Sequence, residues 1–177
     1  MIDNPDPIPD WMVVMGDIKG YQKVPHWSKF NVALFEHNIL LTGVPDDFLL
    51  DHEGNYIIPD YKTSKFTETQ DKLRPMYNIQ LNCYELIATL RDIKPVVGLY
   101  LVYMEPITDE KAAGESRTVE GFDMGFKAYP VAVETNHDAM NEALAKTREL
   151  YELADPPDPI AGCKDCQNLE AIWSLLP

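Results

Sequence analysis

The chain has 177 residues, 45% of them hydrophobic, which is enough for one folded domain and argues against a disordered protein. Its 29 acidic and 15 basic residues give a formal net charge of −14, which argues against a protein that coats nucleic acid through a basic surface. No apolar run approaches the roughly 20 residues needed to cross a bilayer, and the amino terminus carries no secretory signal. We therefore expect a soluble, cytoplasmic protein without a membrane partner.

Residues 1–10 hold three prolines and few apolar side chains, which indicates a poorly ordered lead-in. Residues 11–21 are expected to form a short helix or an irregular packed segment. The weak alternation of residues 30–35 predicts a strand. The whole chain, including a cysteine-containing tail at 155–177, is predicted to form a single domain over 1–177.

Residues 38–50 and 56–63 predict the two strands of a hairpin. The turn between them contains Gly54, which suits a short loop that needs one left-handed residue. Pro45 and Pro59 lack the N–H that a strand donates to its neighbour. Each proline is therefore expected at a sheet edge or a bulge.

Residues 75–91 predict a helix, with Pro75 in its first turn. Apolar residues recur there at helical spacing and are expected to face a sheet: Met76, Ile79, Cys83, Ile87 and Leu90. The apolar run at 96–104 predicts a strand buried on both faces. The polar stretch at 105–118 predicts a loop.

Residues 121–135 predict another strand or a bent pair of strands. Thr135 or Asn136 can cap a long amphipathic helix at 137–153. One or two helical turns are expected in the tail. The order of three strands, a helix, two strands and a helix is typical of an α+β or mixed α/β layer fold.

The hairpin predicts a metal site. With its turn centred on Glu53, Asp46 lies directly opposite Asp60, about 5 Å away, and two like charges at that distance destabilise a sheet unless a cation lies between them. Lys62 projects from the same face of its strand as Asp60, while Tyr61 points to the other face. A surface hairpin with scattered charges is the alternative, and a one-residue shift in register would break the pairing.

On the predicted helix, Gln80 and Tyr84 are four residues apart and share one face. A glutamine on a buried stripe needs hydrogen-bond partners, which favours a place beside polar groups. For Tyr84 alone, simple core packing is the alternative.

Three motifs carry a family resemblance. Gly-Val-Pro-Asp at 43–46, Ile-Pro-Asp-Tyr-Lys-Thr at 58–63 and the Gln80…Tyr84 pair occur in this order along the chain. Together they resemble the G-x-x-D, (D/E)-x-K and Q-x-x-x-Y motifs of the PD-(D/E)XK nuclease superfamily, in its RecB-like branch, which includes CRISPR-associated exonucleases. The resemblance covers residues 39–104 well and extends loosely through the last long helix.

The resemblance implies a restriction-endonuclease-like core, a mixed sheet flanked by helices. It implies a nuclease that hydrolyses DNA at ends or in single strands with Mg²⁺ or Mn²⁺. Asp46 and Asp60 would hold the metal, and Lys62 would assist the chemistry. Gln80 and Tyr84 would position metal, water or DNA.

Two features depart from the family. RecB-like nucleases carry an upstream helix with a further metal ligand, and His26 is the nearest candidate here, although it lacks a helical pattern around it. A missing amino-terminal region, a protein partner or another ligand are the alternatives. Relatives also hold an iron–sulfur cluster, which needs four thiolates. The chain has only Cys83, Cys163 and Cys166, so a complete cluster within it is not expected.

Cys163 and Cys166 form a Cys-x-x-Cys pair that could bind zinc with outside ligands, form a local disulfide, or remain as a vestige. For the whole chain, the main hypothesis is an exonuclease. The rival hypothesis is a catalytically silent member of the same fold that binds nucleic acid or protein. A third is a metal-binding or scaffold protein with an accidental resemblance.

Overall fold

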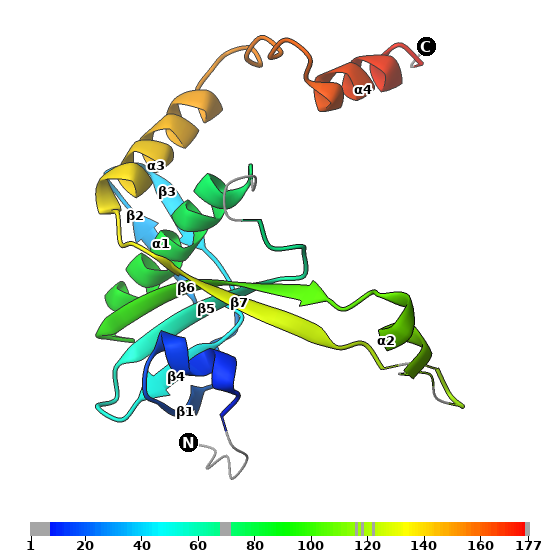
Figure 1. Cartoon of the computed structure of the whole chain (residues 1–177). Helices are drawn as coiled ribbons and strands as arrows, with labels where there is room; N and C mark the ends of the chain where they lie inside the picture. Colours follow the sequence, from blue (N-terminus) through cyan, green and yellow to red (C-terminus); the bar gives the residue numbers. More distant parts are fainter. Residues whose placement is uncertain (1–7, 68–71, 116, 118, 122, 176–177) are drawn as a thin grey trace.

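A five-stranded mixed sheet forms the centre of the protein (Figure 1). The computed structural model describes residues 8–67, 72–115, 117, 119–121 and 123–175. The strand order across the sheet is β1-β4-β5-β6-β7, with β5 and β6 parallel and the other neighbours antiparallel. The strands have these bounds: β1 Ile18–Gln22, β4 Phe48–Asp51, β5 Tyr56–Lys62, β6 Val96–Pro106 and β7 Phe126–Val133.

Helix α1 (Arg74–Leu90) connects β5 to β6 and covers one face of the sheet. A parallel strand pair requires such a crossover, and Pro75 lies in its first turn as predicted. The main hydrophobic core lies between this helix and the sheet, and its fully buried members include Ile58, Leu81, Ile87 and Leu101. The predicted mixed α/β fold is confirmed.

The opposite face of the sheet packs against a 3-10 helix, η1 (Asp10–Met15), through Met15, Ile57 and Val102. The segment 11–21 thus divides into η1 and strand β1. Its pairing with β4 shifts register at Lys19, and this irregularity removes the two-residue alternation by which a strand is predicted.

A separate two-stranded sheet, β2 (Asn31–Leu34) and β3 (Ile39–Thr42), lies beside α1 and α3 (Figure 1). It packs against helix α3 (His137–Tyr151) through a small core containing Met140. The side chain of Asn136 accepts a hydrogen bond from Ala139 N at 2.9 Å, so the predicted helix cap is confirmed.

The prediction of one strand over 38–50 is wrong. The chain leaves β3, crosses residues 43–47 without strand structure and enters β4 in a different sheet. Pro45 is buried and offers no N–H, while Gly43 N–H donates to the carbonyl of Phe30 at 3.3 Å.

The hairpin itself has the predicted register, with Leu49 opposite Ile57. Gly54 takes the expected positive φ, 85°.

The predicted sheet-facing stripe of α1 is also partly wrong. Met76 and Leu90 are 56% and 52% exposed, because they lie near the two ends of the helix, where the core does not cover them. The stripe that packs on the sheet runs instead through Leu81, Tyr84, Ile87 and Ala88.

Strands β6 and β7 continue beyond the end of β5. Lys62 is the last residue of β5 and pairs with Tyr103, whereas β6 and β7 stay paired as far as Pro106 and Phe126. The resulting ribbon projects from the body of the protein and leads into α2 (Glu110–Glu115), within the predicted loop (Figure 1).

The tail forms helix α4 (Lys164–Trp173), which is longer than the one or two turns predicted and has no buried residue among those described. Of the helices in the described residues, none has the length and apolar character needed to span a membrane.

Asn82 should contribute strongly to stability. It is 1% exposed, donates to the carbonyl of Glu134 at 3.2 Å and accepts from Asn136 N at 2.6 Å, so it ties α1 to the segment between β7 and α3. Asn82→Ala should lower the free energy of unfolding by about 1–3 kcal/mol, because two backbone groups lose their partner. Denaturant unfolding measures this. Met76→Ala, on the exposed side of the same helix, should change it by less than about 0.5 kcal/mol; equal effects would contradict the prediction.

Candidate active site

Strand β5 directs two charged side chains toward α1. Asp60 contacts Gln80 of α1, and Lys62 contacts Tyr77 of the same helix. Tyr61, between them, points to the opposite face, where it belongs to the cluster around η1. The alternation predicted for this strand is therefore present. Of these two charged side chains, Asp60 is only 3% exposed and is therefore a buried carboxylate.

Asp46 reaches β5 by a route that differs from the prediction. The pairing of β4 with β5 covers Leu49 and Leu50, so Asp46 lies before the ladder and is not directly opposite Asp60. Its Oδ2 instead accepts the backbone N–H of Tyr61 at 2.8 Å. The predicted cross-strand pairing is wrong, but Asp46 still contacts the residue that follows Asp60.

The backbone of β5 explains this contact. The N–H of Tyr56 points to the β6 side, where it donates to the carbonyl of Pro95, so alternate residues from 57 onward point to the β4 side. Pro59 has no N–H to offer there. The N–H of Tyr61 lies beyond the end of the β4 pairing, and Asp46 takes the place of the absent strand. Pro59 is tolerated in this central strand because the β4 pairing has already ended at Ile57, so no neighbouring strand needs an N–H from residue 59.

The ammonium of Lys62 lies between a carboxylate and an aromatic ring. Its Nζ is 2.5 Å from Asp60 Oδ2 and 4.6 Å from the centre of the Tyr77 ring. That carboxylate oxygen is buried and accepts no well-oriented hydrogen bond from the described residues. Burial raises the pKa of Asp60, Lys62 counteracts this, and the charge of Asp46 adds to the increase. Sequence analysis missed Tyr77, although its position three residues before Gln80 was a signal.

Gln80 links the acid on β5 to the tyrosine on α1. Its Nε2 lies 3.2 Å from Asp60 Oδ1 and 2.7 Å from the Tyr84 hydroxyl, and donates to both. Burial raises the pKa of Tyr84, and the hydrogen bond from Gln80 opposes that change. The structure thus brings together five of the predicted site residues: Asp46, Asp60, Lys62, Gln80 and Tyr84. Their catalytic roles remain predictions.

Gly43 packs against the ring of Tyr84. A Cβ at this position would lie 2.4 Å from Tyr84 Cε1, so only glycine fits beside the ring as it stands. Asp46 follows three residues later, and the ring contact therefore fixes where this segment passes α1. Two motifs that are distant in the sequence touch each other here.

Asp47, which sequence analysis also missed, holds Tyr61 through its side chain. The Tyr61 hydroxyl donates to Asp47 Oδ2 at 3.2 Å, while the Tyr61 N–H goes to Asp46. Two consecutive aspartates therefore hold one residue by its side chain and by its backbone. Burial raises the pKa of Asp47, and the hydrogen bond from Tyr61 opposes that change. Burial also raises the pKa of Tyr61.

His26 is not brought to the aspartates. Its ring packs near Trp27, and its Nδ1 lies 2.9 Å from Ser28 Oγ. In the part of the chain that the structure describes, no group of three or more His, Cys, Asp or Glu side chains is placed to hold a metal ion. The further ligand implied by the family resemblance is therefore not supplied by His26.

The two aspartates nevertheless fit a hard divalent cation. Mg²⁺ is commonly bound through one or two carboxylates, with water and substrate phosphate completing its six ligands. Asp46 is exposed, and the buried Oδ2 of Asp60 already lies beside a positive charge, the Lys62 ammonium. The position next to Asp60 thus suits a cation.

The cysteines lie on two different helices. Cys83 is half-buried on α1, beside the small core under α3, and burial raises its pKa. Cys163 caps α4, and its Sγ accepts from Cys166 N at 3.3 Å. All three are free thiols.

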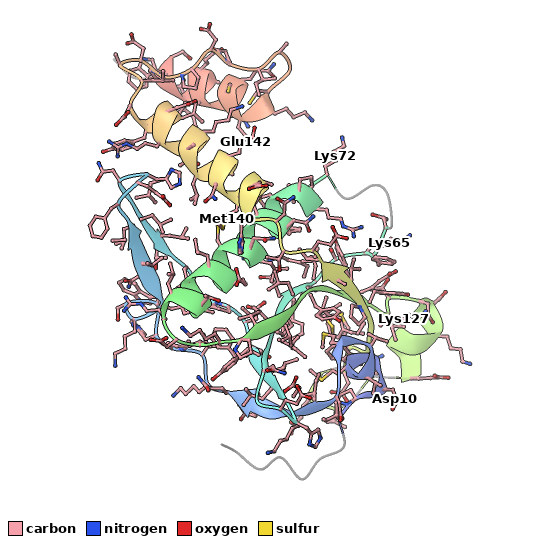
Figure 2. The ribbon with its side chains drawn as sticks, turned by 90° about the vertical axis from the view of Figure 1, so that its left-hand side faces the viewer. Asp10, Lys65, Lys72, Lys127, Met140 and Glu142 are labelled. Carbon is pink, nitrogen blue, oxygen red and sulfur yellow. The ribbon has the colours of Figure 1, made fainter. Side chains whose placement is uncertain are left out.

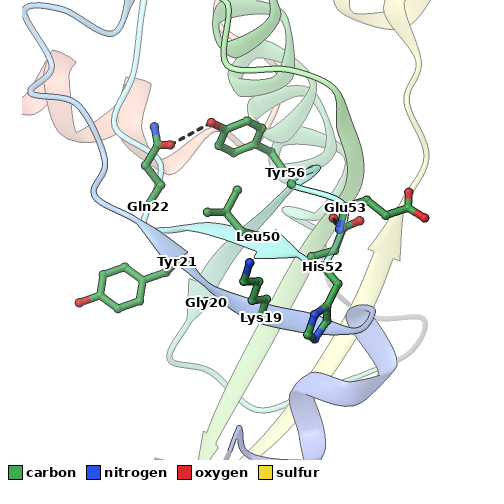
Figure 3. Close-up of a pocket in the computed structure, with 10 residues that line it drawn as sticks. Lys19, Gly20, Tyr21, Gln22, Leu50, His52, Glu53 and Tyr56 are labelled. Atoms are coloured by element: carbon green, nitrogen blue, oxygen red, sulfur yellow. Dashed lines mark hydrogen bonds between the residues drawn. The ribbon is translucent and has the colours of Figure 1, made fainter. Parts of the chain in front are cut away.

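A cavity of about 430 Å³ lies between β1 and the β4–β5 turn, and neither Asp46 nor Asp60 lines it (Figure 3). It is lined by Lys19, Tyr21, His52 and Tyr56 among others, and the Tyr56 hydroxyl donates to Gln22. Tyr56 begins β5 and Asp60 lies four residues further along it, so about 13 Å of strand separates the edge of the cavity from Asp60. The cavity contains none of the predicted site residues.

Comparison with known families gives a match over most of the chain. The sequence model of the family described as "PD-(D/E)XK nuclease superfamily" matches residues 16–170. The matched range includes Asp46, Asp60, Lys62, Gln80 and Tyr84. Comparison with curated proteins and with solved structures gave no significant match.

Substitution of Gly43 should test the contact between the two motifs. Gly43→Ala should destabilise the protein by about 1–3 kcal/mol, because the added methyl group overlaps the Tyr84 ring. Thermal or denaturant unfolding measures the loss. In a Tyr84→Ala background the same change should cost much less, since the ring is gone. A loss of the same size in both backgrounds would show that Tyr84 is not the obstacle.

The pKa of Asp47 predicts a pH dependence of stability. Because burial raises this pKa, the folded protein binds the proton more tightly than the unfolded chain, and stability falls as the pH rises above the ordinary value of 3.8. Asp47→Asn keeps an acceptor for Tyr61 and removes the charge. The variant should unfold at a higher denaturant concentration than wild type at pH 7, with the difference shrinking toward pH 3.8. A difference that does not change with pH would refute this cause.

Proposed function

The chain belongs to the PD-(D/E)XK nuclease superfamily, whose members are generally phosphodiester-hydrolysing nucleases, and we propose that it is an exonuclease that cleaves DNA. In this proposal Asp46 and Asp60 hold Mg²⁺ or Mn²⁺, and Lys62 assists the reaction. The observation that carries it is the buried Asp60, which the Lys62 ammonium and the Gln80 amide approach from two sides.

Each residue has a definite task in this reaction. A bound divalent ion would supply an acidified water and polarise the scissile phosphate. Lys62, next to Asp60, is placed to stabilise negative charge that develops on the phosphate. Gln80 fixes the orientation of Asp60 by donating a hydrogen bond to Oδ1, so Oδ2 faces the Lys62 ammonium. Tyr61 N–H holds Asp46 at the end of β5.

The proposed substrate is a DNA end or a single strand. The net charge of −14 does not favour broad electrostatic binding of a duplex. Exposed lysines are nevertheless present near the end of β5 and the start of α1, and Figure 2 shows Lys65, Lys72 and Lys127 along one side of the molecule. Such a limited set suits contact with a few phosphates of a short strand.

The proposal extends to the RecB-like branch of the superfamily, to which the sequence motifs pointed. Its support is the contact of Gln80 with both Asp60 and Tyr84, which gives the Q-x-x-x-Y spacing a physical task. One observation favours the rival, a catalytically silent binding module: the described residues place no group of three or more His, Cys, Asp or Glu side chains to hold a metal ion.

Two substitutions should separate metal binding from chemistry. Asp60→Ala should abolish Mn²⁺ binding in calorimetric titration and cleavage of labelled single- and double-stranded DNA, because the buried ligand is lost. Lys62→Met should retain Mn²⁺ binding but lower the cleavage rate at least about a hundredfold, since it removes charge stabilisation from the reaction.

The control is His26→Ala, since the contacts of His26 are with Trp27 and Ser28 and not with the two aspartates. This variant should bind Mn²⁺ and cleave DNA like wild type. Wild-type protein that binds no Mn²⁺ and cleaves neither substrate would support the silent module instead. Cleavage that survives both substitutions would point to another site or a contaminant.

A further inference from the structure

We propose that Tyr77 is a positioning residue. When a divalent cation displaces the Lys62 ammonium from Asp60, the Tyr77 ring keeps the ammonium close to the site. The inference rests on the proposed function, because it requires a cation at the aspartates. It concerns a residue that none of the sequence motifs includes.

The first step is a competition for one oxygen atom. Lys62 Nζ lies 2.5 Å from Asp60 Oδ2, which is a buried atom. A divalent cation bound to that oxygen would lie directly beside the Lys62 ammonium, a second positive charge. Since like charges at such distances repel strongly in a partly buried site, the ammonium must withdraw from Asp60 as the cation binds.

The second step is the place to which the ammonium withdraws. The Tyr77 ring lies 4.6 Å from Nζ, within the roughly 6 Å at which an aromatic face attracts a cation. The lysine stem is flexible, so a small rotation moves the ammonium from the carboxylate toward the ring. Without the ring, the ammonium would withdraw into water and away from the phosphate that it must stabilise.

The third step is how the ring is held. Tyr77 lies one turn before Gln80 on α1 and packs partly against the main hydrophobic core. The helix that orients Asp60 through Gln80 therefore also places the ring over Lys62. One rigid element thus sets both positions between which the ammonium moves.

The effect on metal affinity follows from this competition. A cation must displace Lys62 from Asp60. The ring already contacts the ammonium in the metal-free protein, but it stabilises the displaced state more, because the ammonium has then lost the carboxylate and can move closer to the ring. Loss of the ring should therefore weaken metal binding, and it should do so only while Lys62 is present. A purely structural role of Tyr77 would not depend on Lys62 in this way.

The test is calorimetric titration of Mn²⁺ into wild type, Tyr77→Leu and Tyr77→Phe, each also in a Lys62→Met background. Tyr77→Leu should weaken Mn²⁺ binding by about three- to thirtyfold, the range that corresponds to loss of a cation–π contact. Tyr77→Phe keeps the aromatic face and should stay within about twofold of wild type. In the Lys62→Met background, Tyr77→Leu should change the affinity by less than about twofold.

Circular dichroism and thermal unfolding show whether each variant is folded, and Tyr77→Met replaces Tyr77→Leu if the latter is not. Unchanged affinity in folded Tyr77→Leu would overturn the inference and leave the proposed nuclease function intact. Equal weakening with and without Lys62 would also overturn it, since the ring would then act through the fold. Wild-type protein that binds no Mn²⁺ would overturn both this inference and the proposed function.

Discussion

The structure around β5 depends on one buried ion pair. A carboxylate removed from water costs several kcal/mol unless a partner of opposite charge and hydrogen bonds replace the solvent. Asp60 obtains the charge from Lys62 on its own strand and the hydrogen bond from Gln80 on α1. Lys62 is the last residue of β5, so the pair lies at the end of the strand. Because α1 supplies the amide, the position of the helix over the sheet is tied to the same pair.

The segment before β4 is adapted to this arrangement. It leaves the sheet at Gly43, which the Tyr84 ring leaves no room to replace, and it returns with two aspartates that hold Tyr61 at its backbone and its side chain. The break in the strand is thus the means by which Asp46 comes to the end of β5. A continuous strand would have placed a backbone ladder there instead of a carboxylate.

The hairpin turn at Gly54 and the shared face of Asp60 and Lys62 could be predicted, because both depend on local periodicity and turn chemistry. The position of Asp46 could not. It depends on whether the chain continues as a strand after β3, and that choice is decided by contacts with residues far along the sequence. The contact of Tyr77 with Lys62 was missed for a similar reason, since it depends on how α1 lies across β5. Local rules therefore identified the acids and the lysine, while tertiary packing determined how they meet.

The two aspartates differ in their access to solvent, since Asp46 is exposed and Asp60 is buried. An ion arriving from solution can meet the first carboxylate with its hydration shell intact, but it can reach the second only after shedding part of that shell. Mg²⁺ gives up water reluctantly. In the proposed metal site, loss of water at the inner carboxylate would therefore be the step that distinguishes one divalent ion from another.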